Sequence, residues 1–176
     1  MKDLILKDVI RPHPKKGLYF DFTSIINSIH LSNIAEQLYR KISKFNPDAI
    51  IGFGYGGTQL CGAITALFGI PSIIVRTFPH QKQNRQIEGD IDTPKRIVII
   101  DDAIYSGDSI RAMLQIIGDK VSKIVGAGVI YDDWRPLGTC QIEQSLWPII
   151  SLVNKKDISY TRDATPYLTE NKAKSI

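Results

Sequence analysis

The chain has 176 residues, of which 43% are hydrophobic and 23% are charged. This length and composition are typical of one globular domain with a sizeable buried core. The formal net charge of +4 favours anionic ligands, but it is too small and too dispersed to indicate a nucleic-acid partner. The N-terminus is charged throughout, and no apolar run approaches the roughly 18 residues of a membrane span. We therefore expect a cytoplasmic protein with no membrane contact.

The two cysteines, Cys61 and Cys140, lack the spacing of a zinc site or of a disulfide framework. We expect both to be reduced thiols that serve as small packed side chains.

The first elements are a short strand and a long helix. Proline-rich residues 11–14 are predicted to interrupt any regular element, and aromatic residues 18–22 are predicted to form a strand. Apolar residues at helical spacing over 29–45 predict a helix, which the sequence Asn-Pro-Asp at 46–48 ends.

Two strands flank the next helix. Residues 49–52 form an apolar run that leads into a glycine-rich turn at 54–57, and a helix is predicted over 58–68. A further strand is predicted over 72–75. The polar segment 77–95 follows, in which almost no apolar residue is available to anchor a regular element.

The second half of the chain repeats the alternation of strand and helix. Strands are predicted over 97–100, 124–131 and 148–153, and a helix over 109–117. Because the strands read as continuous apolar runs, the pattern predicts an α/β fold with a parallel, Rossmann-like sheet of about five strands and flanking helices. We expect a single domain over 1–176, with an α/β core at 29–153 and a C-terminal tail at 154–176.

The most informative motif follows the strand at 97–100. Two adjacent carboxylates, Asp101 and Asp102, come directly after it, then a short loop with one glycine, then a helix. Taken singly, the acids are explained as solvated turn residues, and Asp108 or Ser109 as helix caps. Together they place carboxylates beside a nest of backbone N–H groups, which suits a ligand carrying both hydroxyls and phosphate. A phosphorylated sugar is such a ligand.

Two further segments lie where such a ligand would bind, at the carboxyl ends of strands. The glycine-rich turn at 52–57 lacks the spacing of a dinucleotide fingerprint, but it offers a second anion site of the size that pyrophosphate needs. The segment 77–95 contains several basic residues and is compatible both with an exposed surface loop and with a lid that closes over bound ligand.

Residues 97–109 resemble the ribose-phosphate motif of the type I phosphoribosyltransferases, and most of the chain is similar to the orotate phosphoribosyltransferases. Residues 18–21 resemble the aromatic strand before their first long helix, and residues 87–89 resemble the return from their mobile loop. The resemblance implies the type I fold with a small N-terminal hood, here residues 1–28. It also implies transfer of a 5-phosphoribosyl group from phosphoribosyl pyrophosphate (PRPP) to a nucleobase, most directly orotate or a related pyrimidine.

The resemblance also implies a role for each matching residue. Tyr55, Gly56 and Gly57 would bind pyrophosphate, and the 5′-phosphate would be bound by Tyr105, Ser106, Gly107, Asp108 and Ser109. The catalytic charges would be Arg76 and, on the lid, His80, Lys82 and Arg85, while Arg111 would meet the carboxylate of the base. Asp101 and Asp102 would hold the ribose hydroxyls and orient the water shell of Mg²⁺ without ligating the metal directly. A homodimer is implied as well.

The chain departs from the orotate pattern at several positions. Thr77, His80 and Lys82 stand where the family usually has lysine, lysine and histidine, Gly56 stands where it has lysine, and Tyr105 where it has threonine. These changes leave a second hypothesis open, a PRPP-binding regulator or sensor with weak or no transferase activity. A third hypothesis is a receiver-type or phosphotransfer domain that uses Asp101 and Asp102 as magnesium ligands.

Overall fold

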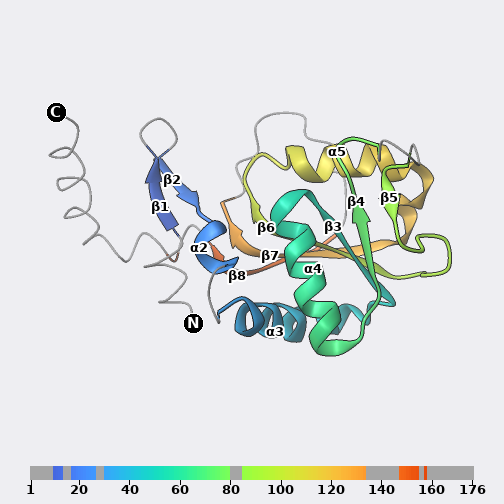
Figure 1. Ribbon diagram of the computed structural model, residues 1–176, viewed down its shortest axis with the longest axis horizontal. Helices are drawn as coiled ribbons and strands as arrows, with labels where there is room; N and C mark the ends of the chain where they lie inside the picture. Colours follow the sequence, from blue (N-terminus) through green and yellow to red (C-terminus); the bar gives the residue numbers. More distant parts are fainter. Residues whose placement is uncertain are drawn as a thin grey trace, which may run out of the picture.

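The computed structural model describes residues 10–13, 17–26, 30–79, 85–133, 147–154 and Asp157. Its centre is a six-stranded sheet of order β5-β4-β3-β6-β7-β8 (Figure 1). All neighbouring strands are parallel except β4 and β5, which are antiparallel. The strands are β3 (Ala49–Phe53), β4 (Ser72–Val75), β5 (Ile87–Glu88), β6 (Ile97–Ile104), β7 (Ile124–Asp132) and β8 (Ile149–Asn154).

Helices cover both faces of this sheet (Figure 1). On one face lie α3 (His30–Ile42), which continues into the 3₁₀ turn η2 (Ser43–Phe45), and α4 (Gly54–Phe68). On the other lies α5 (Asp108–Ile117), followed by the 3₁₀ turn η3 (Gly118–Lys123).

Each face has its own apolar core. Ile50 of β3 packs in the cluster that contains the buried side of α3 and α4, while the next residue, Ile51, packs in the cluster of α5. All five residues of β3 are buried, because successive side chains of a strand point to opposite faces and both faces are covered. Each fully buried Ile or Leu contributes roughly 1.5–3 kcal/mol to stability. This packing explains why the sequences of the central strands contain continuous runs of apolar residues.

The N-terminal residues form an antiparallel hairpin of β1 (Ile10–His13) and β2 (Gly17–Phe20), followed by the short helix α2 (Thr23–Ile26). The hairpin lies at one end of the molecule, outside the six-stranded sheet (Figure 1). The prediction that residues 11–14 interrupt regular structure is wrong, since Pro12 pairs with Leu18 within the ribbon. A two-stranded ribbon has an unpaired edge on each strand, where the missing N–H of proline is tolerated.

The predicted α/β class is confirmed, with two corrections to the sheet. It has six strands where about five were expected, and the additional strand β5 lies in the polar segment 77–95. That segment also has an apolar anchor, since Ile91 is buried in the core. The proposed limits of the hood, core and tail stay predictions.

Two smaller expectations concern the cysteines and the membrane. Cys61 is buried, and burial raises the pKa of its thiol, as does the nearby Asp101, so the thiol stays protonated and unreactive. Cys140 lies outside the described residues. No helix in the described part of the chain combines the length and hydrophobicity that crossing a bilayer requires.

Candidate functional site

The carboxyl ends of three neighbouring strands bring the predicted site residues to one edge of the sheet. Phe53 at the end of β3 pairs with Val75 at the end of β4, and Gly52 pairs with Ile100 of β6. The residues that follow these pairs therefore lie at about the same level of the sheet. This register places the start of α4, Arg76 and the two acids of β6 beside one another.

The acidic pair lies within β6 and not after it. The strand continues to Ile104 beyond its last pairing with β3, because β7 still pairs with it on the other side (Asp101↔Val129 and Ala103↔Tyr131). The prediction of a strand that ends at the acids is thus wrong by four residues. Both carboxylates lie near the first turn of α4, since a Cβ atom on Gly57 would lie 3.6 Å from Oδ1 of Asp101 and one on Gly56 would meet Asp102.

The two carboxylates have different environments. Asp101 is 7% exposed and its Oδ1 accepts a 2.9 Å hydrogen bond from the backbone N–H of Asp102, whereas the Asp102 side chain is half-buried. Burial raises the pKa of Asp101 well above its ordinary value, and the neighbouring negative charge of Asp102 raises it further. The geometry therefore gives one acid that binds a proton readily beside a second, more accessible one.

The second glycine-rich segment is the first turn of α4, not a turn before it. The helix begins at Gly54, whose φ of +67° is a conformation that glycine adopts without strain. The predicted start at Thr58 is therefore one turn too late. The early start directs the first N–H groups of α4, which have no partner within the helix, toward the carboxyl edge of the sheet.

Close packing explains why this turn contains glycine. A Cβ atom on Gly56 would lie 2.4 Å from Cγ of Asp102, and one on Gly57 would lie 2.6 Å from the carbonyl oxygen of Ile100. The carboxylate of Asp102 thus lies against the first turn of α4. The Gly56 position has no room for the lysine usual in orotate phosphoribosyltransferases unless Asp102 moves.

The start of α5 is built differently. Gly107, with a φ of +73°, precedes the helix, and Asp108 is its first residue. Ser106 Oγ donates a 2.6 Å hydrogen bond to Asp108 Oδ2, and Arg111 Nη2 lies 3.0 Å from Asp108 Oδ1. Arg111 Nη2 also donates to the carbonyl oxygen of Ser106 at 3.3 Å. The predicted phosphate loop is therefore closed by a polar contact between its own residues.

This loop surrounds a small pocket. The pocket has a volume of about 70 Å³ and is lined by Asp101 and residues 103–110. Space of that size holds several water-sized atoms, which is the scale of one phosphate group. Asp108 is one of the lining residues, and its side chain is 72% exposed while its carboxylate contacts Ser106 and Arg111.

Of the four basic residues predicted to act on pyrophosphate, the structure describes Arg76 and Arg85. Arg76 directly follows β4, and its Nε lies 3.5 Å from Oε1 of Glu88 in β5. Arg85 Nη2 lies 3.0 Å from the other oxygen, Oε2, of the same carboxylate. His80 and Lys82 lie outside the described residues. Glu88 was not predicted as a site residue; its only sequence signal was its place in the return motif at 87–89.

A second residue that the sequence did not single out is Asp133, directly after β7. It is 2% exposed, and its N–H donates to the carbonyl of Ile104 at 3.0 Å. In the sequence, Asp132-Asp133 is a second pair of adjacent acids at the end of an apolar run, like Asp101-Asp102. This repetition was the signal that could have marked Asp133 as a candidate site residue.

The receiver-type hypothesis loses its support. Such a site needs acids from several strand ends gathered around one ion. Asp132 and Asp133 lie at the end of β7, beside β6, but Asp48 lies before β3, at the opposite edge of the sheet. There its carboxylate accepts hydrogen bonds from the N–H groups of Lys95 and Arg96, both at 3.0 Å. Among the described residues, no three His, Cys, Asp or Glu side chains gather as a metal-binding group.

Comparisons with known proteins agree with this geometry. Residues 25–138, more than half of the chain, match the phosphoribosyl transferase domain family. The orotate phosphoribosyltransferase of Enterococcus faecalis strain OG1RF is 27% identical over 125 residues, which are 69% of this chain and 59% of that protein. The orotate phosphoribosyltransferase of Aquifex aeolicus is 24% identical over 131 residues, 71% of each chain. The chain thus spans about three fifths of the length of the first of these relatives.

Solved structures share the fold. A phosphoribosyltransferase from Corynebacterium diphtheriae has a TM-score of 0.71 at 17% identity, over 90% of this chain and 95% of that one. The Mycobacterium tuberculosis orotate phosphoribosyltransferase in complex with PRPP has a TM-score of 0.66 at 20% identity, over 89% and 88% of the two chains. With the acidic strand and two glycine-dependent helix starts at one edge of the sheet, the chain belongs to the phosphoribosyl transferase domain family and has the type I phosphoribosyltransferase fold.

Proposed function

We propose that the protein transfers the 5-phosphoribosyl group of PRPP to a nucleobase, orotate or a related pyrimidine, and releases pyrophosphate. The observation that carries this proposal is the contact of Asp102 with the first turn of α4 at Gly56. It joins the acidic strand, which leads into the phosphate loop, to the second anion-binding helix start. The two halves then form one site with the order phosphate, hydroxyls, pyrophosphate, which is the order of groups along PRPP.

The sugar phosphate would be bound at the start of α5. The 5′-phosphate would accept hydrogen bonds from the N–H groups of residues 105–109, where Gly107 permits close backbone approach, and from the hydroxyls of Ser106 and Ser109. Asp101 and Asp102 would accept hydrogen bonds from the ribose hydroxyls, and Asp102 is the more accessible of the two.

The reaction breaks the bond between carbon 1 and the pyrophosphate oxygen and forms a bond from carbon 1 to a ring nitrogen of the base. Pyrophosphate leaves with the electron pair, and the proton of the ring nitrogen goes to solvent. Negative charge therefore grows on the pyrophosphate, beside Tyr55, Gly56 and Gly57. Arg76 would neutralise it from the end of β4, and Arg85 would add its charge from the base of the lid. His80 and Lys82 would arrive with the lid and exclude water.

The donor set fits Mg²⁺ held through the substrate. Two adjacent carboxylates supply oxygen ligands or water contacts, and within the described residues no third ligand joins them. Asp101 and Asp102 would therefore orient water molecules of a magnesium ion that PRPP itself carries. When bound, this ion would neutralise pyrophosphate charge as it leaves.

Three finer assignments rest on the resemblance. Arg111, which lies beside the phosphate loop, would bind the carboxylate of the base after exchanging its contact with Asp108. The protein would act as a homodimer, and it would act in the cytoplasm.

One observation favours the sensor hypothesis as a second candidate. Residue 56 is glycine, and a side chain at this position would meet the carboxylate of Asp102. The pyrophosphate half of the site therefore has no lysine here. Losing a cation there weakens stabilisation of the leaving group more than binding of the sugar phosphate. The result would be a protein that binds PRPP and reacts slowly.

One assay separates the two candidates. Pyrophosphate release is measured with PRPP and Mg²⁺ while orotate, uracil and purine bases are added in turn, and PRPP binding is measured in parallel by calorimetry. Turnover with a pyrimidine supports the transferase. Tight PRPP binding without turnover on any base supports the sensor, and absence of PRPP binding contradicts both.

A further inference from the structure

Glu88 bridges the two arginines that lie at the base of the lid segment. Its Oε1 faces Nε of Arg76 at 3.5 Å and its Oε2 faces Nη2 of Arg85 at 3.0 Å. Each oxygen of the carboxylate therefore has its own cation. Arg76 enters the segment from β4 and Arg85 leaves it toward β5, so this one side chain connects both ends.

The carboxylate of Glu88 offsets the repulsion between the two arginines. Two guanidinium groups near one another repel, and a carboxylate between them allows them to stay together with a residual charge of +1. Arg76 contacts Glu88 through Nε, and 48% of its side chain is exposed. The cluster thus presents positive charge to solvent while its geometry is fixed.

The backbone around Glu88 is firmly attached to the sheet. Glu88 pairs with Ile74 of β4, and the N–H of Arg76 donates to the carbonyl of Gln86 at 2.8 Å. The side-chain amide of Gln86 donates to the carbonyl oxygens of Arg76 and Thr77, at 3.2 and 3.0 Å. The ends of the segment are therefore held together by backbone and side-chain bonds alike.

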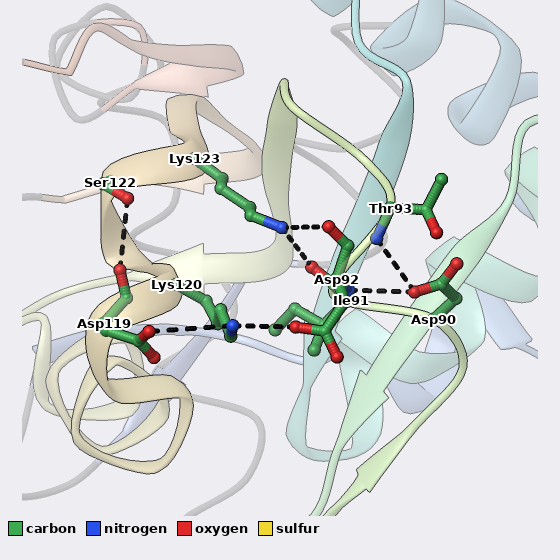
Figure 2. Close-up of polar contacts among 8 residues, drawn as sticks. All are labelled: Asp90, Ile91, Asp92, Thr93, Asp119, Lys120, Ser122 and Lys123. Carbon is green, nitrogen blue, oxygen red and sulfur yellow. Dashed lines mark hydrogen bonds and ion pairs between the residues drawn. The ribbon is translucent and has the colours of Figure 1, made fainter.

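The return from the lid is also attached to η3 on the far side (Figure 2). Lys123 Nζ donates to the carbonyl oxygens of Ile91 and Asp92, and Lys120 Nζ lies 2.7 Å from Oδ1 of Asp92. Asp90 Oδ1 accepts bonds from the N–H groups of Asp92 and Thr93, at 2.9 and 3.0 Å. Glu88 thus lies on an edge strand that pairs with β4, and the residues that follow this strand are attached to η3.

We propose that Glu88 is a positioning residue, which holds the guanidinium groups of Arg76 and Arg85 together at the pyrophosphate end of the site. This inference rests on the proposed function, in which that anion binds beside Arg76. Glu88 does not touch the substrate; it acts through the two arginines.

The ion pairs themselves add little to stability. The side chains of Arg76 and Arg85 are 48% and 57% exposed, and pairs of this kind contribute little to folding. Loss of the carboxylate should therefore leave the fold intact and change what the arginines bind. This separation makes the proposal testable with one isosteric substitution.

The experiment compares Glu88→Gln with Glu36→Gln, which removes the carboxylate of a second Glu–Arg pair on α3, Glu36 with Arg40. Binding of magnesium pyrophosphate is measured by calorimetry, and kcat and KM are measured with PRPP. We expect Glu88→Gln to weaken pyrophosphate binding by roughly fivefold or more and to lower kcat. Glu36→Gln should match the parent protein, and Glu88→Asp should restore part of the affinity.

A second arm tests whether Glu88 acts through the arginine. In an Arg76→Ala background, Glu88→Gln should change pyrophosphate affinity less than about twofold, because the group that it positions is gone. The proposal is overturned if Glu88→Gln binds pyrophosphate as tightly as the parent or more tightly, or if its effect is undiminished in that background. A parent protein that binds neither PRPP nor pyrophosphate would instead contradict the proposed function, before any variant is compared.

Discussion

The starts of α4 and α5 perform similar tasks with different construction. Each follows a strand of the same sheet and depends on a glycine in the left-handed region, Gly54 in one and Gly107 in the other. The first turn of α4 contains no acid and is packed against β6 so closely that neither Gly56 nor Gly57 has space for a Cβ atom. The first turn of α5 contains Asp108, whose contact with Ser106 occupies a hydroxyl that a phosphate would use.

The difference shows two ways to prepare an anion site. At α4 the backbone is fixed by steric fit, so the N–H groups need no rearrangement when an anion binds. At α5 the Ser106 hydroxyl donates to Asp108 of the same loop, so an incoming phosphate must replace this contact. The pyrophosphate half should therefore be sensitive to side-chain volume and the phosphate half to side-chain charge.

The largest effect is expected for the acids that lie between the two helix starts. Asp101→Asn combined with Asp102→Asn should lower kcat/KM by at least about a hundredfold, because both contacts to the ribose hydroxyls and to the magnesium waters are changed. Pyrophosphate release measures the rate, and far-ultraviolet circular dichroism confirms that the variant is folded. A double variant that retains the parent rate would remove the central role of these residues.

The next effect tests steric fit at α4. Gly57→Ala should lower the free energy of unfolding by about 2 kcal/mol, because the new methyl group meets the rigid backbone carbonyl of Ile100. Gly62→Ala is the matched control, since a Cβ at Gly62 meets nothing within 4 Å, and it should stabilise the helix by roughly 0.5–1 kcal/mol. Urea denaturation measures both. Equal effects of the two substitutions would show that the start of α4 is not sterically restricted.

A third prediction concerns pH. The pKa of Asp101 is raised in the folded protein, so folding favours its protonated form and this contribution to stability is lost as pH rises from about 4 through the raised value. Asp101→Asn should therefore raise the free energy of unfolding at pH 7 by about 1 kcal/mol and flatten its dependence on pH. Thermal unfolding between pH 4 and 8, without Mg²⁺, measures this. A variant less stable than the parent at pH 7 would contradict the assigned environment.

The smallest effect tests charge at α5. Asp108→Asn keeps an oxygen that accepts the Ser106 hydrogen bond but removes a negative charge from the phosphate loop, so inorganic phosphate should bind about threefold more tightly. Asp119→Asn, at a similarly exposed acid of η3, is the control and should leave phosphate affinity unchanged. Weaker binding by Asp108→Asn would show that Asp108 supports the phosphate site and does not compete for it.

The sequence predicted most of the sheet because buried parallel strands are continuous apolar runs. The residues of β4 were predicted without error, since Pro71 and the polar segment bound it sharply. The helix start at Gly54 was missed because glycine has low helix propensity, whereas the close packing of this turn against β6 requires glycine at positions 56 and 57. The length of β6 was missed because pairing with β7, not local composition, carries the strand past its acids.

The candidate site was predictable where one motif contains several functional residues, as at 101–109. Glu88 was not predictable as a site residue, because an isolated glutamate in a polar segment has no periodicity or spacing to distinguish it. Its importance arises from the pairing of β4 with β5, which brings residues 76, 85 and 88 together. Sequence patterns thus identified the motifs near the strand ends. The pairing of the antiparallel edge strand β5 with β4, which brings Glu88 to Arg76 and Arg85, was visible only in the structure.

The central claim is that the two helix starts form a single PRPP site. The most direct measurement is competition calorimetry with Mg²⁺, in which PRPP is titrated into the protein alone, with pyrophosphate, and with ribose 5-phosphate. We predict one PRPP bound per chain, displaced by either fragment, and a Ser106→Ala variant that loses affinity for ribose 5-phosphate but not for pyrophosphate. If only one of the two fragments displaces PRPP, the two helix starts do not share one ligand and the account is contradicted.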